Sequence, residues 1–92
     1  TSEVSVSGKR VRLTPTEYRM LCQLVRNEGR VVTHHSLLER VWGSEYVDDV
    51  SFVKKYIYRL RSKLEDKDDN PRMLVSERGL GYRFIKAPDS GG

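Results

Sequence analysis

The residues of this 92-residue chain that are best suited to chemistry are basic residues that lie close together. Between Ser51 and Leu64 the sequence contains five lysines and arginines and no acidic residue. The five are Lys54, Lys55, Arg59, Arg61 and Lys63. Ammonium and guanidinium groups donate hydrogen bonds to phosphate oxygens, and both also match the two acceptors on the major-groove edge of guanine. The stretch therefore favours a polyanionic partner.

A helix from residue 48 to 65 is predicted to carry these side chains. Its apolar residues recur at spacings of four, three and four, which indicates one buried stripe of Val53, Ile57, Leu60 and Leu64. Opposite that stripe lie Ser51, Lys55, Tyr58 and Ser62, and at its edges lie Lys54, Arg59 and Arg61. Asp48 or Asp49 is expected to cap the helix, since acids favour a helix N-terminus. The helix thus buries one face and presents a basic one.

The charge of the whole chain agrees with an anionic partner. The formal net charge is +4 and the sequence pI is about 9.4. Four acids lie together with one lysine at 65–69, so the remaining surface is more basic than the net charge indicates. Such a balance favours anions without identifying one. The length predicts one domain with a small core.

Other kinds of site are disfavoured by what the sequence lacks. The single cysteine, Cys22, allows neither an internal disulfide nor a multi-cysteine zinc site, and its apolar face predicts a buried thiol. His34 and His35 would point about 100° apart on a helix, so no metal or cofactor is expected. No nucleophile–base pair or carboxylate pair indicates an enzyme. The lack of disulfides, signal peptide and membrane span favours a cytoplasmic protein without a membrane partner.

The first third of the chain predicts a hairpin and a helix. Valines alternate with polar residues on both sides of Gly8-Lys9-Arg10, which indicates a short β-hairpin. Thr14 and Glu17 form a capping-box pattern at the start of a helix that Gly29 ends. The predicted buried stripe of this helix is Tyr18, Leu21, Cys22 and Val25.

A shorter helix is predicted to precede the basic one. Thr33 is expected to cap it, and it extends to about Trp42. Trp42 fits either the core or a helix end where its indole N–H donates to a phosphate. A loop over residues 43–47 then leads to the basic helix. This sequence of helix, short helix, loop and longer basic helix is the helix-turn-helix order.

After the acidic linker the sequence predicts a strand, a glycine-containing turn and a second strand. The strands are expected at 73–76 and 82–85. A β-hairpin directly after the basic helix forms a wing, here with Arg78 at its tip. An arginine in this place can enter the minor groove of DNA; the alternative is an exposed side chain without function. Residues 87–92, APDSGG, predict a disordered tail.

Four motifs occur in a specific order along the chain. They are LTPTE at 13–17, GRVV at 29–32, LR-x-KL at 60–64 and RG-x-GYRF at 78–84. Together they resemble the winged-helix effector domain of the OmpR/PhoB family of bacterial response regulators, over a match from Val11 to Phe84. The resemblance implies an α+β winged helix-turn-helix: N-terminal antiparallel strands, three helices and a C-terminal β-hairpin wing, over residues 1–86.

The resemblance also implies partners. The domain would regulate transcription on double-stranded DNA as head-to-tail dimers at direct-repeat promoter sites, below a receiver domain that a sensor kinase phosphorylates. The loop implied to contact RNA polymerase comprises Gly43, Ser44, Glu45, Tyr46 and Val47. Family members carry a four-stranded N-terminal sheet, of which two strands are evident here. Because the chain also begins with Thr1 rather than Met, we expect a fragment that is truncated in this sheet.

The predicted DNA contacts fall into groups. Lys55 and Arg59 are the candidates for guanine edges in the major groove, and Arg78 is assigned to the minor groove. Flanking contacts are expected from Ser51, Lys54, Tyr58 and Ser62. Contacts that position the protein on the DNA backbone are expected from Arg61, Thr33, His35, Trp42 and Tyr82.

Two positions depart from the family pattern. Tyr58 stands where a basic residue is frequent, and it can still donate to a phosphate or pack on a thymine methyl. Glu77 stands beside Arg78 at the wing, where it must point away from DNA or lower the affinity.

Two other binding functions fit parts of the pattern. A winged helix can hold an acidic protein partner on its basic helix, which predicts weak DNA binding that is indifferent to sequence. RNA binding has less support, because no pair of exposed aromatic residues is predicted on a sheet.

Overall fold

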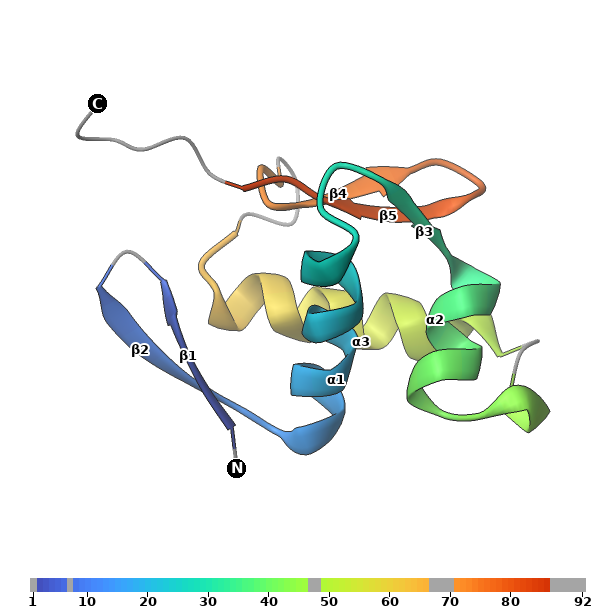
Figure 1. The fold of residues 1–92 in the computed structure, drawn as a ribbon, viewed down its shortest axis with the longest axis horizontal. Coiled ribbons are helices and arrows are strands. Elements are labelled where there is room, and N and C mark those ends of the chain that lie inside the picture. The colour runs from blue at the N-terminus through green and yellow to red at the C-terminus, as the bar shows by residue number, and fades with distance from the viewer. Residues whose placement is uncertain (1, 7, 47–48, 67–70, 87–92) are drawn as a thin grey trace.

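The structure, a computed structural model, describes residues 2–6, 8–46, 49–66 and 71–86. Its elements in chain order are β1 (Ser2–Val6), β2 (Lys9–Leu13), α1 (Pro15–Arg26), β3 (Val31–Thr33), α2 (His34–Val41), the 3-10 helix η1 (Ser44–Tyr46), α3 (Val50–Lys63), β4 (Leu74–Glu77) and β5 (Gly81–Phe84). The α-helices pack together, with the sheet of β3, β4 and β5 along one side and the β1–β2 hairpin beside the C-terminal end of α3 (Figure 1). The predicted α+β order is confirmed, while the predicted tail at 87–92 lies outside the described residues.

The predicted N-terminal hairpin is present. β1 and β2 pair antiparallel, with Val4 opposite Val11. Lys9 already pairs with Val6, so the turn is shorter than the predicted Gly8-Lys9-Arg10. Gly8 makes this tight reversal with a φ of +79°, which a residue with a side chain rarely adopts.

The start of α1 is held by the predicted capping box and by an ion pair that was not predicted. Thr14 Oγ1 accepts a hydrogen bond from the Glu17 N–H at 3.2 Å, and Glu17 Oε1 accepts one from the Thr14 N–H at 2.9 Å. Lys63 Nζ, at the end of α3, also donates to Glu17 Oε1 at 2.6 Å. Burial acts to raise the pKa of Glu17, but the hydrogen bonds from Lys63 and Thr14 outweigh it, so the pKa lies below its ordinary value. The ion pair thus fastens the end of α3 to the start of α1.

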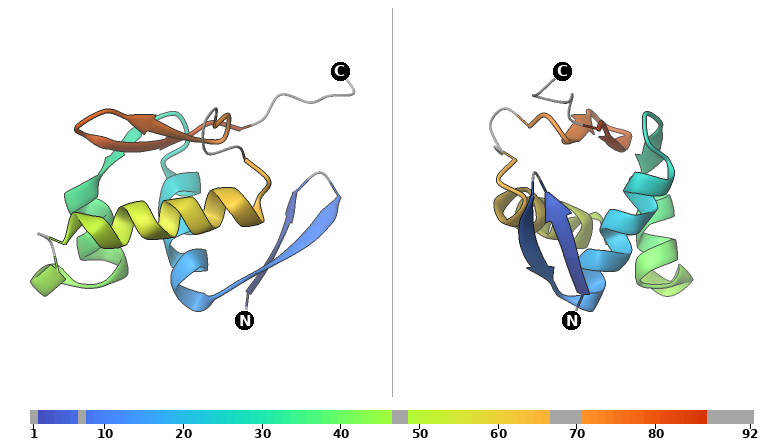
Figure 2. Two further views of the ribbon diagram at one scale, coloured as in Figure 1. Left: turned by 180° about the vertical axis from the view of Figure 1, so that it is seen from behind. Right: turned by 60° about the vertical axis from the view of Figure 1, so that its left-hand side comes forward.

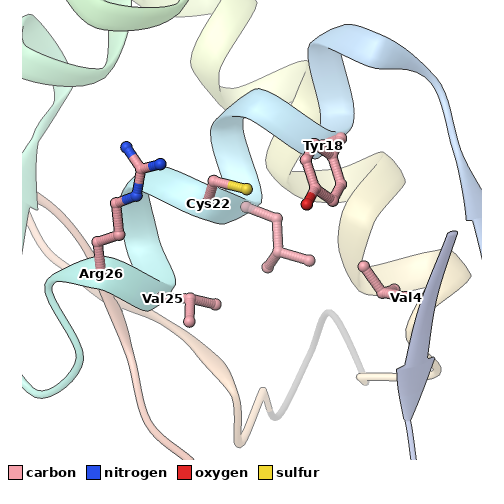
Figure 3. A pocket seen from close by; sticks show the side chains of 6 residues that line it. Val4, Tyr18, Cys22, Val25 and Arg26 are labelled. Atoms are coloured by element: carbon pink, nitrogen blue, oxygen red, sulfur yellow. The ribbon is translucent and has the colours of Figure 1, made fainter. Parts of the chain in front are cut away.

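The buried face of α1 differs from the predicted one. Met20 and Leu24 are fully buried, whereas Tyr18 is 38% and Val25 43% exposed. These two exposed side chains and the half-buried Cys22 line a groove of 320 Å³ on the outer side of α1 (Figure 3). The predicted stripe is therefore wrong at three of its four positions. The helix carries two apolar arcs, and periodicity alone does not say which one packs against the other helices.

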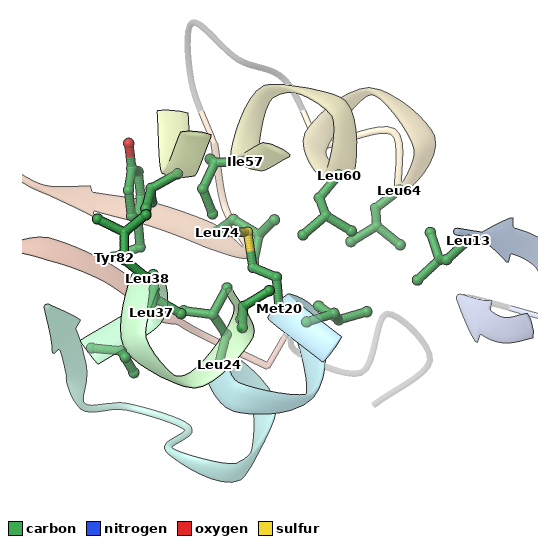
Figure 4. Packing of buried hydrophobic residues seen from close by; sticks show 14 residues of the cluster. Leu13, Met20, Leu24, Leu37, Leu38, Ile57, Leu60, Leu64, Leu74 and Tyr82 are labelled. Carbon is green, nitrogen blue, oxygen red and sulfur yellow. The ribbon is translucent and has the colours of Figure 1, made fainter. Parts of the chain in front are cut away.

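The core lies between the α-helices and the inner side of the sheet. The predicted stripe of α3 is confirmed, because its four apolar residues are at most 5% exposed. They pack with residues from β2, α1, α2 and the wing (Figure 4). The residues of this core that are 0% exposed include Leu13, Met20, Leu24, Leu37, Leu38, Val53, Leu60 and Leu74.

The three-stranded sheet has the order β3-β5-β4, with both pairs antiparallel. The wing strands were predicted within one residue or so, but β3, which is only three residues long, was not. Thr33 of β3 lies opposite Gly81 of β5. A Cβ atom at Gly81 would come within 2.0 Å of the Val32 carbonyl oxygen, so only glycine allows this close pairing.

Two buried charges fasten the wing to the end of α3. The Arg61 guanidinium donates to the Leu74 carbonyl oxygen from Nε at 3.0 Å and from Nη2 at 2.6 Å. On the other side of the same residue, Asp66 Oδ2 accepts from the Leu74 N–H at 2.9 Å, and the Asp66 carboxylate also accepts from the N–H groups of Arg72 and Met73. Both charged residues are at most 7% exposed. The first strand of the wing is therefore held at one backbone position by a cation and an anion from the α3 end.

Within the described part of the chain, no helix combines the length and the apolar character that a membrane span requires.

Candidate nucleic-acid interface

The outward face of α3 is the basic surface that the sequence predicted. The predicted contact residues on this face are all exposed, and the side chain of Tyr58, the aromatic one among them, is 60% exposed. Seen from behind, α3 crosses in front of α1 and α2 with its outer side uncovered (Figure 2, left). The exposed set is Ser51, Lys54, Lys55, Tyr58, Arg59 and Ser62.

Only three of the five basic residues of α3 belong to this face. Arg61 is buried and donates to Leu74, while Lys63, although exposed, is paired with Glu17 of α1. Lys54, Lys55 and Arg59 form no ion pair within 4 Å with any residue that the structure describes. Their charge is therefore available to a ligand.

The N-terminus of α3 is formed differently from the prediction. Asp49 occupies the N-cap position, but its side chain makes no capping hydrogen bond to the backbone. Instead Asp49 Oδ1 accepts a hydrogen bond from the Ser51 hydroxyl at 2.7 Å. Asp48, the other candidate cap, lies outside the described residues. This bond leaves the two lone pairs of the Ser51 oxygen free to accept.

The tip of the wing carries Arg78 on an exposed turn. Gly79 adopts a φ of +77° there, and the Leu80 N–H donates to the Glu77 carbonyl oxygen at 2.9 Å. The Glu77 carboxylate is held by Arg83, with Oε1 2.6 Å from Nη2. The acid beside Arg78 is therefore neutralised within the wing.

A groove of 260 Å³ separates the wing from the N-terminal part of α3. It brings together the cations Lys54 and Arg78, which are distant in the sequence. His34, at the start of α2, lines the same groove and meets the Tyr82 ring edge-on, with centroids 5.5 Å apart. Burial lowers the pKa of His34, and Lys54 nearby lowers it further. The sequence-based prediction selected His35 instead. The start of the helix determines which of the two histidines turns inward, and the Thr33 cap was the sequence signal for that start.

The residues predicted to contact the DNA backbone divide between surface and interior. Thr33 and His35 are exposed at the start of α2, although the Thr33 hydroxyl already accepts from the Ser36 N–H at 3.1 Å. Arg61 and Tyr82 are each only 7% exposed, and the Arg61 guanidinium lies over the Tyr82 ring at 5.7 Å. We therefore leave Arg61 and Tyr82 out of the proposed interface.

Trp42 belongs to an aromatic cluster between α2, η1 and α3. Its ring stacks on Phe52 with centroids 5.5 Å apart and an interplanar angle of 24°, and it meets Tyr56 edge-on at 5.2 Å. Tyr46 of η1 joins the cluster through Phe52 at 6.1 Å. Trp42 is half-buried, so it lies at the edge of the core, between the two predicted alternatives. Its contact with a phosphate stays a prediction. The cluster attaches the loop predicted to contact RNA polymerase to α3; Val47 of that loop lies outside the described residues.

Among the residues that the structure describes, no group of three or more histidine, cysteine, aspartate or glutamate side chains is placed to hold a metal ion. The candidate interface comprises instead hydrogen-bond donors on α3, α2 and the wing.

Comparison with known proteins identifies the family. The family model described as "Transcriptional regulatory protein, C terminal" matches residues 8–84. The transcriptional regulatory protein KdpE of Mycobacterium tuberculosis H37Rv is 44% identical over 82 residues, which are 89% of this chain and 36% of KdpE. The sensory transduction protein RegX3 of Mycolicibacterium smegmatis is 46% identical over 81 residues, 88% of this chain and 36% of RegX3. The chain thus spans little more than a third of the length of these relatives.

Solved structures agree. The DNA-binding domain of Klebsiella pneumoniae RstA, in complex with the RstA box, superposes with a TM-score of 0.83 at 30% identity, covering 90% of this chain and 82% of that one. The DNA-binding domain of Bacillus subtilis CssR gives a TM-score of 0.75 at 26% identity and covers 89% of each chain. The fold class and the family resemblance read from the sequence are both confirmed, and the chain belongs to the C-terminal winged-helix domains of the OmpR/PhoB family of transcriptional regulators.

Proposed function

We propose that this chain binds double-stranded DNA in a sequence-specific manner, as the effector domain of a two-component response regulator, and thereby regulates transcription. The observation that carries the proposal is the exposed face of α3, on which three cations lie without an acidic partner among the described residues. The similarity to RstA, whose domain was solved with the RstA box, and to AdeR, solved with an intercistronic region, supports it.

In the proposed complex α3 lies in the major groove. The groove of B-DNA is about 12 Å wide, which admits one α-helix with its side chains. Lys55 and Arg59 would donate to the O6 and N7 atoms of guanine. Ser51, Tyr58 and Ser62, on the same exposed face, would make the flanking contacts. Sequence preference would therefore reside in a few side chains of one helix.

The wing would contact the adjacent minor groove through Arg78. An arginine is attracted there by the negative potential of a narrow minor groove. The ion pair of Glu77 with Arg83 supports this placement, because it offsets the repulsion that a free acid would cause. Lys54 and Arg78 flank the groove between α3 and the wing, so the DNA backbone that separates the major from the minor groove would pass over both cations.

Contacts from α2 would position the domain without reading sequence. The exposed Thr33 and His35 lie at the N-terminus of α2, where backbone N–H groups and the helix dipole favour a phosphate. Trp42, at the other end of α2, would add an indole donor. These contacts would affect all DNA sequences alike.

The remaining parts of the proposal concern the longer protein in its cell. They follow from the family and from relatives of which this chain matches about a third. We propose an upstream receiver domain phosphorylated by a sensor kinase, head-to-tail dimers on direct-repeat promoter sites and a bacterial cytoplasmic location. RNA polymerase would contact the loop from Gly43 to Val47, of which Tyr46 is 41% exposed.

Fluorescence anisotropy on two labelled duplexes across a salt series tests the proposal. One duplex has random sequence, and the other is recovered by this chain from a randomised pool of direct repeats. Each phosphate contact should contribute about 0.9 to the slope of log affinity against log salt. A steep slope with a gap of roughly 10³-fold between the duplexes is expected. Equal and weak binding to both would contradict the proposal and favour an acidic protein partner for the basic helix.

A further inference from the structure

Tyr56 lies beside the exposed basic face rather than on it. It is half-buried on α3, one turn before Arg59. The guanidinium carbon of Arg59 lies 5.1 Å from the centre of the Tyr56 ring. A cation within about 6 Å of a ring centre is attracted by the negative face of the aromatic system. The exposed side chain of Arg59 therefore has a defined position, in contact with a ring of its own helix.

The Tyr56 ring is itself held in place. It meets the Trp42 ring at a centroid distance of 5.2 Å and an interplanar angle of 64°. Trp42 in turn stacks on Phe52 at 5.5 Å. A ring that contacts Trp42, which is itself stacked on Phe52, has little freedom to rotate, so it provides a fixed support for the guanidinium of Arg59.

Among the described residues, no acidic side chain competes with Tyr56 for Arg59. In the part of the chain that the structure describes, the ion pairs join Lys9 with Glu65, Lys63 with Glu17, and Arg83 with Glu77, and none includes Arg59. A free arginine must give up rotamer entropy when it binds, which lowers the affinity it provides. A guanidinium that rests on an aromatic face keeps the N–H donors in its plane available for acceptors. Contact with Tyr56 therefore restricts Arg59 without occupying its donors.

We propose that Tyr56 is a positioning residue for base recognition: its ring, held by Trp42, orients Arg59 toward the edge of a guanine before DNA is bound. This inference rests on the proposed DNA-binding function and adds a residue that touches no base. The aromatic cluster of Trp42 and Phe52 then has a second role besides packing, which is to hold the Tyr56 ring in place.

Five chains test the inference: the wild type, the single variants Tyr56→Leu, Tyr56→Phe and Arg59→Ala, and the double variant Tyr56→Leu/Arg59→Ala. The probes are a random duplex and a duplex that the wild-type chain selects from a randomised pool. Leucine keeps apolar bulk against Trp42 but removes the aromatic face, whereas phenylalanine keeps the face and loses only the hydroxyl. Tyr56→Leu should weaken binding to the selected duplex about three- to fivefold, as expected for an exposed cation–π contact. Binding of Tyr56→Leu to the random duplex and of Tyr56→Phe to both should stay within about twofold of the wild type.

The double variant Tyr56→Leu/Arg59→Ala separates positioning from folding. If Tyr56 acts through Arg59, the leucine substitution should change binding to the selected duplex less than twofold once Arg59 is absent, because a double-mutant cycle isolates the coupling between the two residues. Thermal melts identify a temperature at which all the chains are folded, and binding is measured there.

Three results would overturn the inference. In the first, Tyr56→Leu weakens binding to the selected duplex as much without Arg59 as with it. In the second, Tyr56→Phe weakens this binding as much as Tyr56→Leu does. In the third, Tyr56→Leu weakens binding to the random duplex as much as binding to the selected one. Failure of the proposed function is distinguishable from these, because the wild type itself would then not prefer the selected duplex. If the wild type shows the preference, Arg59→Ala reduces it and Tyr56→Leu leaves its size unchanged, the positioning role alone is refuted.

Discussion

Arg59 and Arg61 stand two residues apart on α3 and have opposite surroundings. Arg59 is exposed and rests on an aromatic ring, whereas Arg61 is 7% exposed and donates to the Leu74 carbonyl oxygen and to Ser76 Oγ. A shift of two residues turns a side chain by about 200° around a helix, so the two guanidinium groups leave it in different directions. One arginine is therefore available to a ligand and the other builds the fold.

The same division holds for the whole of α3. The inner side fixes where the wing lies, through Arg61 and the Asp66 carboxylate that follows the helix. The outer side, with Lys55 and Arg59, is the part proposed to read DNA. A buried charge needs partners for all of its polar atoms, and removing it leaves those partners unpaired. An exposed charge can be removed with little effect on folding. Substitutions on the two sides should therefore affect different measurements.

Asp66→Ala should have the largest effect on stability. It would leave the N–H groups of Arg72, Met73 and Leu74 without their acceptor. The Leu74 hydrogen bond is buried and the other two are partly buried. Since a buried polar group that loses its partner costs about 1–3 kcal/mol and a partly buried one less, the free energy of unfolding should fall by about 3 kcal/mol. Urea denaturation measures it. The neighbouring exposed Glu65→Gln is the control and should change it by less than about 0.5 kcal/mol. A loss no larger than that of the control would refute the role assigned to Asp66.

Arg61→Ala should come next, with a loss of about 1.5–3 kcal/mol, as for hydrogen bonds from a charged donor. Because its guanidinium faces the interior, the folded variant should bind random duplex with the salt slope of the wild type. Lys54→Ala, at the position proposed to lie against the DNA backbone, should instead reduce that slope by about 0.9, the contribution of one phosphate contact. Unchanged stability together with weaker binding to all duplexes would return Arg61 to the interface, as the sequence alone had suggested.

Arg59→Ala should change binding and leave folding almost intact. Affinity for the selected duplex should fall by about 1–3 kcal/mol, with specificity relaxed at one base pair. The free energy of unfolding should stay within about 0.5 kcal/mol of the wild type. Anisotropy on selected duplexes with single base changes measures the first effect, and urea denaturation the second. A uniform loss across all base changes would show that Arg59 contacts only the backbone.

His34 should give the smallest effect, seen as a pH dependence. Burial, and then Lys54, lower its pKa in the folded chain. The unfolded chain, with an ordinary histidine pKa of about 6.5, therefore binds a proton at higher pH, so stability should decrease as pH falls below about 6.5. His34→Phe, which keeps a ring against Tyr82, should weaken this dependence, and His35→Gln should not. Equal pH dependence in His34→Phe and the wild type would contradict this account.

The sequence was sufficient for the elements that repeat a pattern. Apolar spacing and capping signals located the helices, and alternation with glycines located the wing, because these patterns reflect local backbone geometry. β3 was missed because three residues are too short to show alternation. The buried face of α1 was predicted on the wrong side of the helix, because Tyr18 and Cys22 form a second apolar arc beside that of Met20 and Leu24.

The interface was predicted less completely, for a different reason. Charged residues are usually exposed, so Arg61 was assigned to the DNA-contacting surface, and the acidic stretch that includes Asp66 was treated as a linker. Their partners are backbone groups of the wing, 13 residues after Arg61 and 8 after Asp66, and no pattern in the sequence marks such pairs. The supporting role of Tyr56 likewise depends on ring contacts that only the folded chain reveals.

The most direct test of the account is an NMR titration of the isotope-labelled chain with its selected duplex, read as shifts of the backbone amide signals. If the outer side of α3 reads DNA, the largest shifts should occur on the exposed side of α3, from Ser51 to Ser62, and at the wing tip around Arg78. Signals along the outer groove of α1, at Tyr18, Cys22 and Val25, should stay unchanged. Shifts concentrated in that groove, with α3 and the wing unaffected, would contradict the claim that the outer side of α3 reads DNA.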